Sequence, residues 1–313
     1  MTIVRQAKFR SVRCVVFLAC LLALSATVDA RTLFAWGEAG HRIIAQAAVV
    51  ALPAEMPAFF RNASAQLAYL NPEPDRWRSR TERDRDSALE AGSSTDHFLD
   101  TELIPAERRA NAFAAQSRYA YADTLRSMGI SALTTGFLPF RVLELSQRLR
   151  VEFGLWRSAP NTQTREWIEA RIINDAGILG HYVADGSNPA HLSVQHNGWT
   201  GPNPNGYATD KRFHSRFESG YVQAQITLTD VQPLVGAPGR THRDLRPAIV
   251  HYLSETFAEV EPLYRLDQAV NFGAETTSSK AKRYTAARLA AGSRMLRDLW
   301  WTAWVTSDSS QSR

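Results

Sequence analysis

Histidines and carboxylates recur at metal-binding spacings in the middle of this 313-residue chain. The segment HYVADGSNPAH runs from His181 to His191, and HSRFE begins at His214. On a helix, residues i and i+4 share a face, which places His181 beside Asp185. The same spacing places His214 beside Glu218. Imidazole nitrogen with carboxylate oxygen, without sulfur, suits zinc, so the two pairs predict a metal site.

Three motifs nearer the N-terminus add ligands of the same kinds. WGEAGH runs from Trp36 to His41, PDRWR contains Asp75, and DHFLD contains His97. A single His–Asp pair is also typical of an ordinary ion contact. Burying all these polar groups without a cation would be costly, so we interpret them together as one metal centre.

With these motifs in view, the chain resembles the zinc-dependent phospholipase C and single-strand nuclease superfamily, and most of all its S-one/P-one nucleases. The resemblance covers Trp36 to about Tyr221. It is carried by the WGxxGH, DHFxD and HxxxDxxxxxH motifs. Further towards the C-terminus the sequence shows only compatible helices. The resemblance implies an all-α fold and three bound Zn²⁺ ions.

The resemblance also implies a role for each matching position. The implied ligands of the first zinc are Asp75, His97, His181 and Asp185. Those of the second are His191, His214 and Glu218. Those of the third are the free amine and carbonyl oxygen of Trp36, together with His41 and a bridging Asp185. The implied substrate contacts are Arg78 against the scissile phosphate and Phe98 with Asp100 against a base. The predicted catalytic residues are Asp75, Arg78 and Asp185.

This set of residues suits phosphodiester cleavage. Close metal ions lower the pKa of a water towards neutrality and stabilise charge on the leaving oxygen. The guanidinium fork of Arg78 fits phosphate oxygens. The ring of Phe98 offers a stacking face to an unpaired base, which favours single-stranded substrates.

Other interpretations stay open for individual residues. Arg78 also begins a mixed charge run that extends to Asp86, and such a run is typical of a solvated surface. Phe98 could equally be an aromatic residue of the core, and the role of Asp100 in binding a base depends on that of Phe98. Glu218 stands where the nucleases usually have aspartate, and glutamate there resembles the phospholipase branch. The remaining histidines are interpreted as structural: His196, His242 and His251.

The first 35 residues predict an export signal. A basic start precedes an apolar run from Cys14 to Thr27 that is too short to span a membrane, and Ala30 and Ala35 are alternative cleavage sites. The segment carries five basic residues and one acidic residue, so most of the formal charge of +5 leaves with it. The high pI is therefore no sign of a nucleic-acid partner. Both cysteines also leave, so the mature chain has no disulfide.

The mature chain predicts a single mostly helical domain over 36–306, with a disordered tail over 307–313. Helical patterns cover 41–52, 110–128, 138–153, 164–185, 247–260 and 280–304. The stretch 164–185 is apolar on nearly every side, so it should be buried with its metal ligands facing a cleft between helices. Glycine, proline and asparagine mark 196–210 as a loop beside that cleft. We expect core packing, not membrane contact, for Trp300, Trp301 and Trp304.

The predicted function is that of an exported, periplasmic or secreted zinc-dependent phosphodiesterase. The leading interpretation is a monomeric nuclease that cleaves single-stranded RNA or DNA to 5′-nucleotides by a metal-activated hydroxide. A phospholipase C-like hydrolase of phospholipids is the alternative enzyme. A non-catalytic zinc-binding protein of the cell envelope is the alternative from another class. The mature chain is not expected to insert stably into a membrane.

Overall fold

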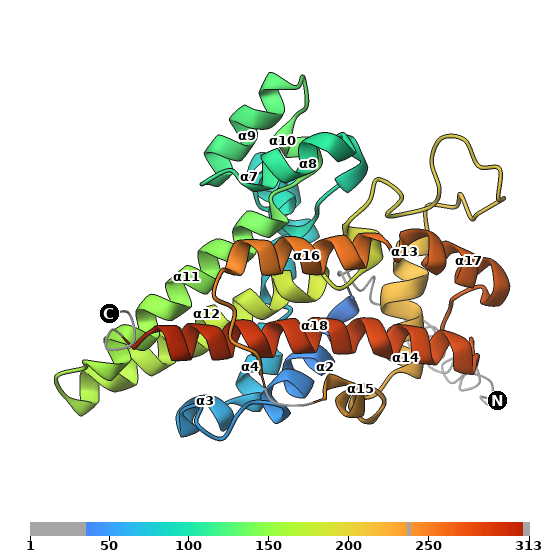
Figure 1. The fold of residues 1–313 in the computed structure, drawn as a ribbon. Helices are drawn as coiled ribbons and strands as arrows, with labels where there is room; N and C mark the ends of the chain where they lie inside the picture. The colour runs from blue at the N-terminus through green and yellow to red at the C-terminus, as the bar shows by residue number, and fades with distance from the viewer. Residues whose placement is uncertain (1–35, 237–238, 309–313) are drawn as a thin grey trace, which may run out of the picture. The chain divides into compact units, whose positions relative to one another are not determined.

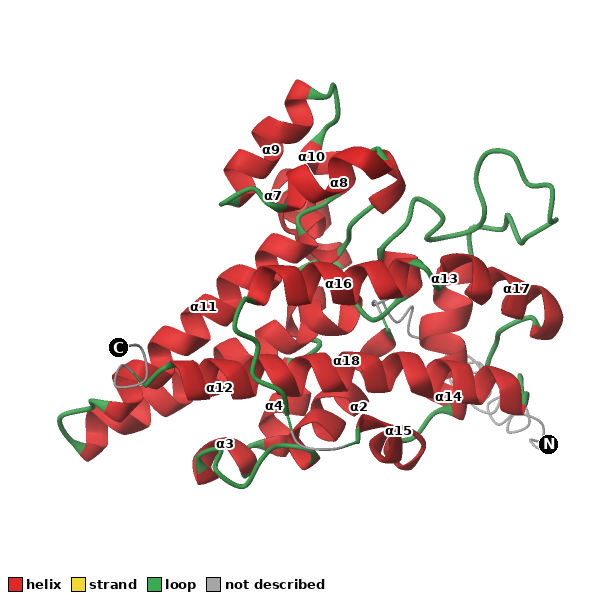
Figure 2. Ribbon diagram, viewed as in Figure 1, coloured by secondary structure: helices red, strands yellow, loops and turns green. Residues whose placement is uncertain are grey.

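The computed structural model describes residues 36–236 and 239–308, without the side chains of residues 89 and 90. All of these belong to one compact unit, Leu33–Arg313. Helices and loops alone make up the described residues, apart from an isolated bridge between His196 and Gly198 (Figure 2). The predicted all-α domain is thus confirmed. The predicted signal over 1–35 and residues 309–313 of the predicted tail lie outside the described residues.

The fold is a set of long helices joined by shorter ones (Figure 1). The long helices are α2 (Gly37–Val50), α11 (Leu138–Arg157), α12 (Thr162–Asp185), α16 (Leu245–Phe257), α17 (Val260–Val270) and α18 (Ser279–Thr306). The shorter ones are α3 (Ala58–Arg61), α4 (Ser64–Leu70), α5 (Glu73–Arg76), α6 (Arg80–Arg85), α7 (Ser87–Ser94), η1 (Thr95–His97), η2 (Thr101–Leu103), α8 (Ala106–Phe113), α9 (Arg118–Ser127), α10 (Ala132–Thr135), η3 (Pro189–His191), α13 (Phe213–Ser215), the π-helix η4 (Arg216–Tyr221), α14 (Val222–Gln225) and α15 (Leu228–Val235).

Helix α12 lies at the centre and carries two of the predicted ligands at its C-terminal end. It packs against α2, α4, α11 and α18. Its start is fixed by the side chain of Asn161, which accepts a hydrogen bond from the Thr164 amide at 2.8 Å. From Asp175 to its end at Asp185 every residue is buried, but much of 164–174 is exposed, including Trp167. The predicted burial of 164–185 therefore holds only for the C-terminal half of the helix, because the N-terminal half carries charged and polar residues on its outer side. The core therefore surrounds the ligand-bearing end.

Two predicted helices are each divided in the structure. The pattern over 110–128 forms the end of α8 and then α9, because Ser117 caps the second helix by accepting from the Ala120 amide at 3.2 Å. The pattern over 247–260 ends at Phe257, and α17 starts anew at Val260. The prediction of one continuous helix over each stretch was therefore wrong. Apolar periodicity alone did not reveal these breaks.

Trp300 lies in the core, and Trp301 and Trp304 are half-buried against it, in keeping with the predicted core packing. Trp300 is fully buried, with its ring centroid 5.2 Å from that of Phe60. The ring centroid of Trp304 lies 5.5 Å from that of Phe153, and the guanidinium carbon of Arg157 lies 3.4 Å from the centroid of the Trp304 ring. The described part of the chain contains no helix that is long and apolar enough to cross a membrane.

A buried carboxyl pair between α11 and α12 gives the fold a pH-dependent stability. Burial first, and then the charge of Asp175, raises the pKa of Glu152 to about 7, although Arg171 opposes the shift. Folded protein therefore holds a proton between pH 4.5 and about 7 that the unfolded chain releases, so stability falls as pH rises through this window.

Replacing Glu152 by glutamine, which resembles the protonated acid, should remove this loss. We expect Glu152→Gln to be more stable than the unchanged protein by about 1–2 kcal/mol at pH 8, and no more stable at pH 5. Urea unfolding at the two pH values measures the difference. Glu166→Gln, at an exposed position of α12, is the control. An equal gain at both pH values would contradict the assigned cause.

Candidate metal centre

Seven different elements bring the predicted ligands together, although they are far apart in the sequence. The elements and their ligands are α2 with His41, α5 with Asp75, η1 with His97, α12 with His181 and Asp185, η3 with His191, α13 with His214, and η4 with Glu218. Three groups of side chains are close enough to hold a cation: His41, Asp75 and His181; His97, His181 and Asp185; and His191, His214 and Glu218. Every histidine and carboxylate predicted as a ligand therefore lies in one cluster.

Asp185 belongs to the second group and lies close to histidines of the other two. Its Oδ2 lies 3.1 Å from Nδ1 of His97 and 3.2 Å from Nε2 of His181. Its Oδ1 lies 3.5 Å from Nε2 of His41 and 3.8 Å from Nδ1 of His191. Burial alone would raise its pKa, but the imidazoles of His181 and His191 hold the pKa of Asp185 well below its ordinary value. It is therefore a charged carboxylate among four imidazoles.

Glu218 is the centre of the third group. Its Oε2 lies 2.7 Å from Nε2 of His214, and its Oε1 lies 3.3 Å from Nε2 of His191. The predicted i,i+4 pairing of His214 with Glu218 holds, but across the junction between α13 and the π-helix η4. Short π-helical segments are frequent at functional sites, because the extra residue redirects side chains.

The orientation of three imidazoles supports a cation in the cluster. Nδ1 of His181 faces the carbonyl oxygen of Asn71 at 3.0 Å, and Nδ1 of His191 faces that of His97 at 2.8 Å. Nδ1 of His214 faces the carbonyl oxygen of His196 at 3.1 Å. A carbonyl oxygen only accepts, so each Nδ1 must donate.

In their neutral form, the three imidazoles then present the lone pair of Nε2. Each of those lone pairs faces a carboxylate oxygen, and two acceptors repel unless a positive charge lies between them. Metal-bound histidines usually have this arrangement, with the outer nitrogen donating to an oxygen.

Unpaired buried atoms give an independent test of the fit. Six side-chain atoms in the cluster are buried and have no hydrogen-bond partner among the described residues: Nε2 of His41, His97 and His191, Oδ2 of Asp75, Oδ1 of Asp185 and Oε2 of Glu218. Buried polar atoms are normally satisfied, and leaving so many unsatisfied would be costly. Burial also lowers the pKa of His41 to about 3, so its ring is neutral and able to coordinate. The residues present thus fit a nitrogen- and oxygen-liganded metal.

Trp36 lies next to this cluster, as the WGEAGH motif predicts. Its indole is fully buried, and its N–H donates to the carbonyl oxygen of Ala184 at 2.8 Å, one residue before Asp185. Trp36 and Gly37 both have a positive φ, of 47° and 55°. A side chain on Gly37 would also meet the backbone of Glu218 at 3.3 Å, which explains the glycine. The backbone of Trp36 as a metal ligand stays a prediction.

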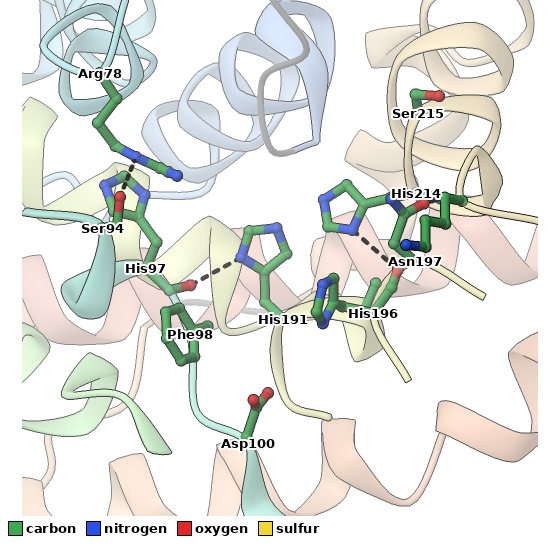
Figure 3. Close-up of a pocket in the computed structure, with 12 residues that line it drawn as sticks. Arg78, Ser94, His97, Phe98, Asp100, His191, His196, Asn197, His214 and Ser215 are labelled. Carbon is green, nitrogen blue, oxygen red and sulfur yellow. Dashed lines mark hydrogen bonds between the residues drawn. The ribbon is translucent and has the colours of Figure 1, made fainter. Parts of the chain in front are cut away.

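A pocket of about 380 Å³ opens onto the cluster. Three of the metal-cluster histidines line it: His97, His191 and His214. Arg78, Phe98 and Asp100 line the same pocket (Figure 3). Nη1 of Arg78 lies 3.7 Å from Oδ1 of Asp75, and its Nε donates to Ser94 at 3.1 Å. The three residues predicted to contact substrate therefore line the same pocket as the metal-cluster histidines. The rest of the charge run, Arg80–Arg85, forms the exposed helix α6.

Backbone contacts on both sides fix the segment that carries Phe98 and Asp100. The amide of Leu99 donates to the carbonyl of His191 at 2.8 Å, and the amide of Asp100 donates to that of Thr135 at 2.8 Å. Gly136 approaches so closely that a Cβ there would lie 2.0 Å from the carbonyl oxygen of Phe98. Burial and then Glu102 raise the pKa of Asp100 to about 7, so near neutrality this carboxyl can both donate and accept.

Several site residues were not predicted from the sequence. Asn71 holds two ligand histidines: its side-chain oxygen accepts from Nδ1 of His41 at 2.8 Å, and its carbonyl faces His181. The side-chain amide of Asn188 donates to Glu218. Neither asparagine has a spacing that marks it, although both directly precede a proline. The pocket is completed by His196, which we had interpreted as structural only, and by Asn197, Lys211 and Ser215.

Removing the Asn71 side chain should weaken metal binding without removing a ligand. We expect Asn71→Ala to lose roughly 10- to 100-fold in affinity for one zinc ion, because His41 loses the bond that fixes its tautomer and ring orientation. Competition titration with a zinc-sensitive dye measures the affinity. Asn62→Ala, at an exposed position, should bind as the unchanged protein does. Equal affinities for both variants would contradict the role of Asn71.

No protein-family model and no curated protein matches the sequence. Two solved structures are similar in fold. The alpha toxin from Clostridium absonum has 13% identity and a TM-score of 0.42, covering 86% of this chain and 65% of the toxin. The Clostridium perfringens alpha-toxin from avian strain SWCP has 16% identity and a TM-score of 0.41, covering 88% and 65%. The chain thus spans less than two thirds of either toxin, and similarity at this level does not transfer a function.

Proposed function

We propose that the protein is a zinc-dependent phosphodiester hydrolase. The observation that supports this most directly is the set of imidazole Nε2 atoms facing the carboxylates of Asp185 and Glu218 at the base of a pocket. The nitrogen-rich ligand set favours zinc over magnesium or calcium, which prefer oxygen. We propose three ions, held as the resemblance implies.

The chain's own residues then act on the substrate in three ways. Asp185 and Asp75 hold negative charge at the centre of the imidazole cluster and so fix the position of bound cations. Arg78 is held towards the cluster by Asp75 and Ser94, so its guanidinium can bind two oxygens of a phosphate that enters the pocket. Metal ions bound there would acidify a water and neutralise charge at the phosphate and leaving oxygen.

Within this class we propose single-stranded RNA or DNA as the substrate. Phe98 is half-buried in the pocket wall, and Asp100 lines the same pocket. A base could therefore stack on the ring of Phe98 while its edge forms hydrogen bonds with the carboxyl group of Asp100. A paired base inside a duplex cannot reach such a ring. The products would be 5′-nucleotides, as the resemblance implies.

Replacing Phe98 should separate nucleic-acid cleavage from other activities. We expect Phe98→Ala to lower kcat/KM on single-stranded RNA by roughly 10- to 100-fold, because stacking of one base contributes about 1–3 kcal/mol. Hydrolysis of a small phosphodiester that carries neither a base nor an aromatic ring, such as glycerophosphocholine, should change little.

The matched control is Phe257→Ala, a half-buried phenylalanine that contacts Arg109 outside the pocket. It should cleave RNA at the unchanged rate. If Phe98→Ala lowered kcat/KM equally on both classes of substrate, the proposal that a base stacks on Phe98 would be wrong. The proposed hydrolase function would still stand.

The second candidate is a phospholipase C-like hydrolase. Glu218, where the nucleases usually have aspartate, favours this branch, and the metal cluster and Arg78 would serve a phospholipid phosphate equally well. Lipid cleavage that is insensitive to Phe98→Ala would support it. A non-catalytic zinc-binding envelope protein, the third candidate, predicts bound zinc without turnover on either substrate.

Export is part of the proposal, because it determines the third zinc site. Cleavage after Ala35 would give a free amine to Trp36, whose indole N–H donates to the carbonyl oxygen of Ala184. Cleavage after Ala30 would leave five residues in front of Trp36 and remove that ligand. N-terminal sequencing of the secreted or periplasmic protein distinguishes the two.

A further inference from the structure

A second cavity, of about 660 Å³, lies among the C-terminal end of α15, α16 and α18. It shares no lining residue with the metal-centre pocket. Its walls carry five basic side chains: Arg240, His242, His251, Arg294 and Arg297. A volume of this size accommodates a ligand as large as a nucleotide.

The two acids on its walls are already bound to other groups. Oδ1 of Asp298 accepts from Nε of Arg297 at 2.9 Å and from the backbone amide of Arg240 at 3.0 Å. Glu255 lies 3.3 Å from Nε2 of His251 on the exposed face of α16. Asp298 thus compensates the charge of Arg297. In the described part of the chain, neither acid forms an ion pair with the side chain of Arg240.

Arg294 increases the positive charge of this cavity. Its Nη1 donates to the carbonyl oxygen of Leu234 at 2.8 Å, which fixes the guanidinium but does not neutralise it. Burial, and then the charges of Arg288 and Arg297, lower the pKa of Arg294. Among the described residues no carboxylate forms an ion pair with Arg294. The cavity therefore has an excess of positive charge that is partly shielded from solvent.

His242 adds a donor or acceptor that lacks a hydrogen bond. Its Nε2 is buried without a hydrogen-bond partner among the described residues, and lies 3.9 Å from Oδ2 of Asp298. The backbone amide of His242 donates to Thr302 at 3.0 Å, which fixes the residue to α18. An unsatisfied buried nitrogen beside a positive cavity is the position at which a ligand oxygen would complete the bonding.

We propose that this cavity binds a phosphate group, held by the guanidinium groups of Arg240 and Arg294 and by Nε2 of His242. Two guanidinium groups present several N–H donors in fixed planes, and this suits the oxygens of a phosphate. The ligand is therefore a phosphate-bearing small molecule: inorganic phosphate, a nucleotide or a phospholipid headgroup. This inference does not rest on the proposed hydrolase function.

Isothermal titration of the zinc-loaded protein tests the site with three probes: inorganic phosphate, 5′-AMP and water-soluble dihexanoyl phosphatidate. Comparison of the unchanged protein with Arg240→Gln/Arg294→Gln isolates the cavity, whether or not the metal centre also binds phosphate. We expect the double variant to lose one phosphate site, or to bind at least tenfold more weakly there. The tightest-binding probe identifies the source of the phosphate.

Three further variants keep the result interpretable. Arg243→Gln removes a charge from the same loop but not from the cavity wall, and should bind as the unchanged protein does. Arg240→Lys/Arg294→Lys retains charge and should recover part of the binding. Arg240→Gln alone alters an exposed side chain and should still weaken binding if the double variant fails to fold. Unchanged binding in Arg240→Gln, or equal weakening in Arg243→Gln, would overturn the proposal.

Discussion

Asp185→Asn is expected to remove phosphodiester hydrolysis almost completely, by about 10³-fold or more in kcat. The substitution keeps the shape of the side chain but removes the negative charge on which four imidazoles converge, within 3.8 Å of its two oxygens. Charge stabilisation by bound metal contributes several kcal/mol to such a reaction, and the amide would weaken both the binding and the placement of the cations. Turnover of the zinc-loaded variant measures the effect.

The matched control is Asp175→Asn, a buried aspartate on the same helix that faces Arg148 rather than the metal cluster. It should retain most of the activity. Zinc content, measured on both variants, shows whether Asp185→Asn loses metal, rate or both. Full activity in Asp185→Asn would exclude the cluster as the catalytic centre, whatever the zinc content.

Removal of metal is expected to destabilise the fold as well as stop turnover. Six buried atoms of the cluster have no hydrogen-bond partner within the described part of the chain, and without a cation the carboxylates must pair with protonated imidazoles instead. A ligand present at a thousand times its Kd stabilises a protein by about 4 kcal/mol. For a chain of this size that corresponds to a Tm decrease of roughly 10 °C on chelation.

Thermal unfolding with and without a chelator, followed by return of zinc, magnesium or calcium, measures this effect. Zinc should restore Tm and activity, because the imidazole-rich site favours it, whereas magnesium and calcium should not. Asp185→Asn should show a much smaller change on chelation. A Tm that is independent of chelator and of added zinc would contradict a metal centre.

The candidate site could be predicted largely because helix periodicity acts over short distances. His181 and Asp185 lie one turn apart on the buried C-terminal half of α12, where most residues are apolar, so their shared buried face follows from the sequence. Arg78, Phe98 and Asp100 were assigned by resemblance, and the structure brings all three into the ligand-lined pocket. Their roles there stay predictions.

The long-range supports of the site could not be predicted in the same way. Asn71 contacts His181 because Gly180 allows close approach, with a Cβ there only 2.3 Å from the Asn71 amide. That contact depends on how two helices cross, and no local pattern encodes it. The breaks within 110–128 and 247–260 were missed for a related reason, since their apolar spacing continues across the break.

One comparison tests the hydrolase most directly: turnover of zinc-loaded protein beginning at Trp36 on single-stranded RNA and on phosphatidylcholine, each with and without chelator. The proposed function predicts RNA cleavage to 5′-nucleotides that the chelator abolishes, with little or no lipid cleavage. Chelator-sensitive lipid cleavage alone would make the protein a phospholipase C-like enzyme. Bound zinc without turnover of either substrate would contradict the hydrolase and favour a zinc-binding protein.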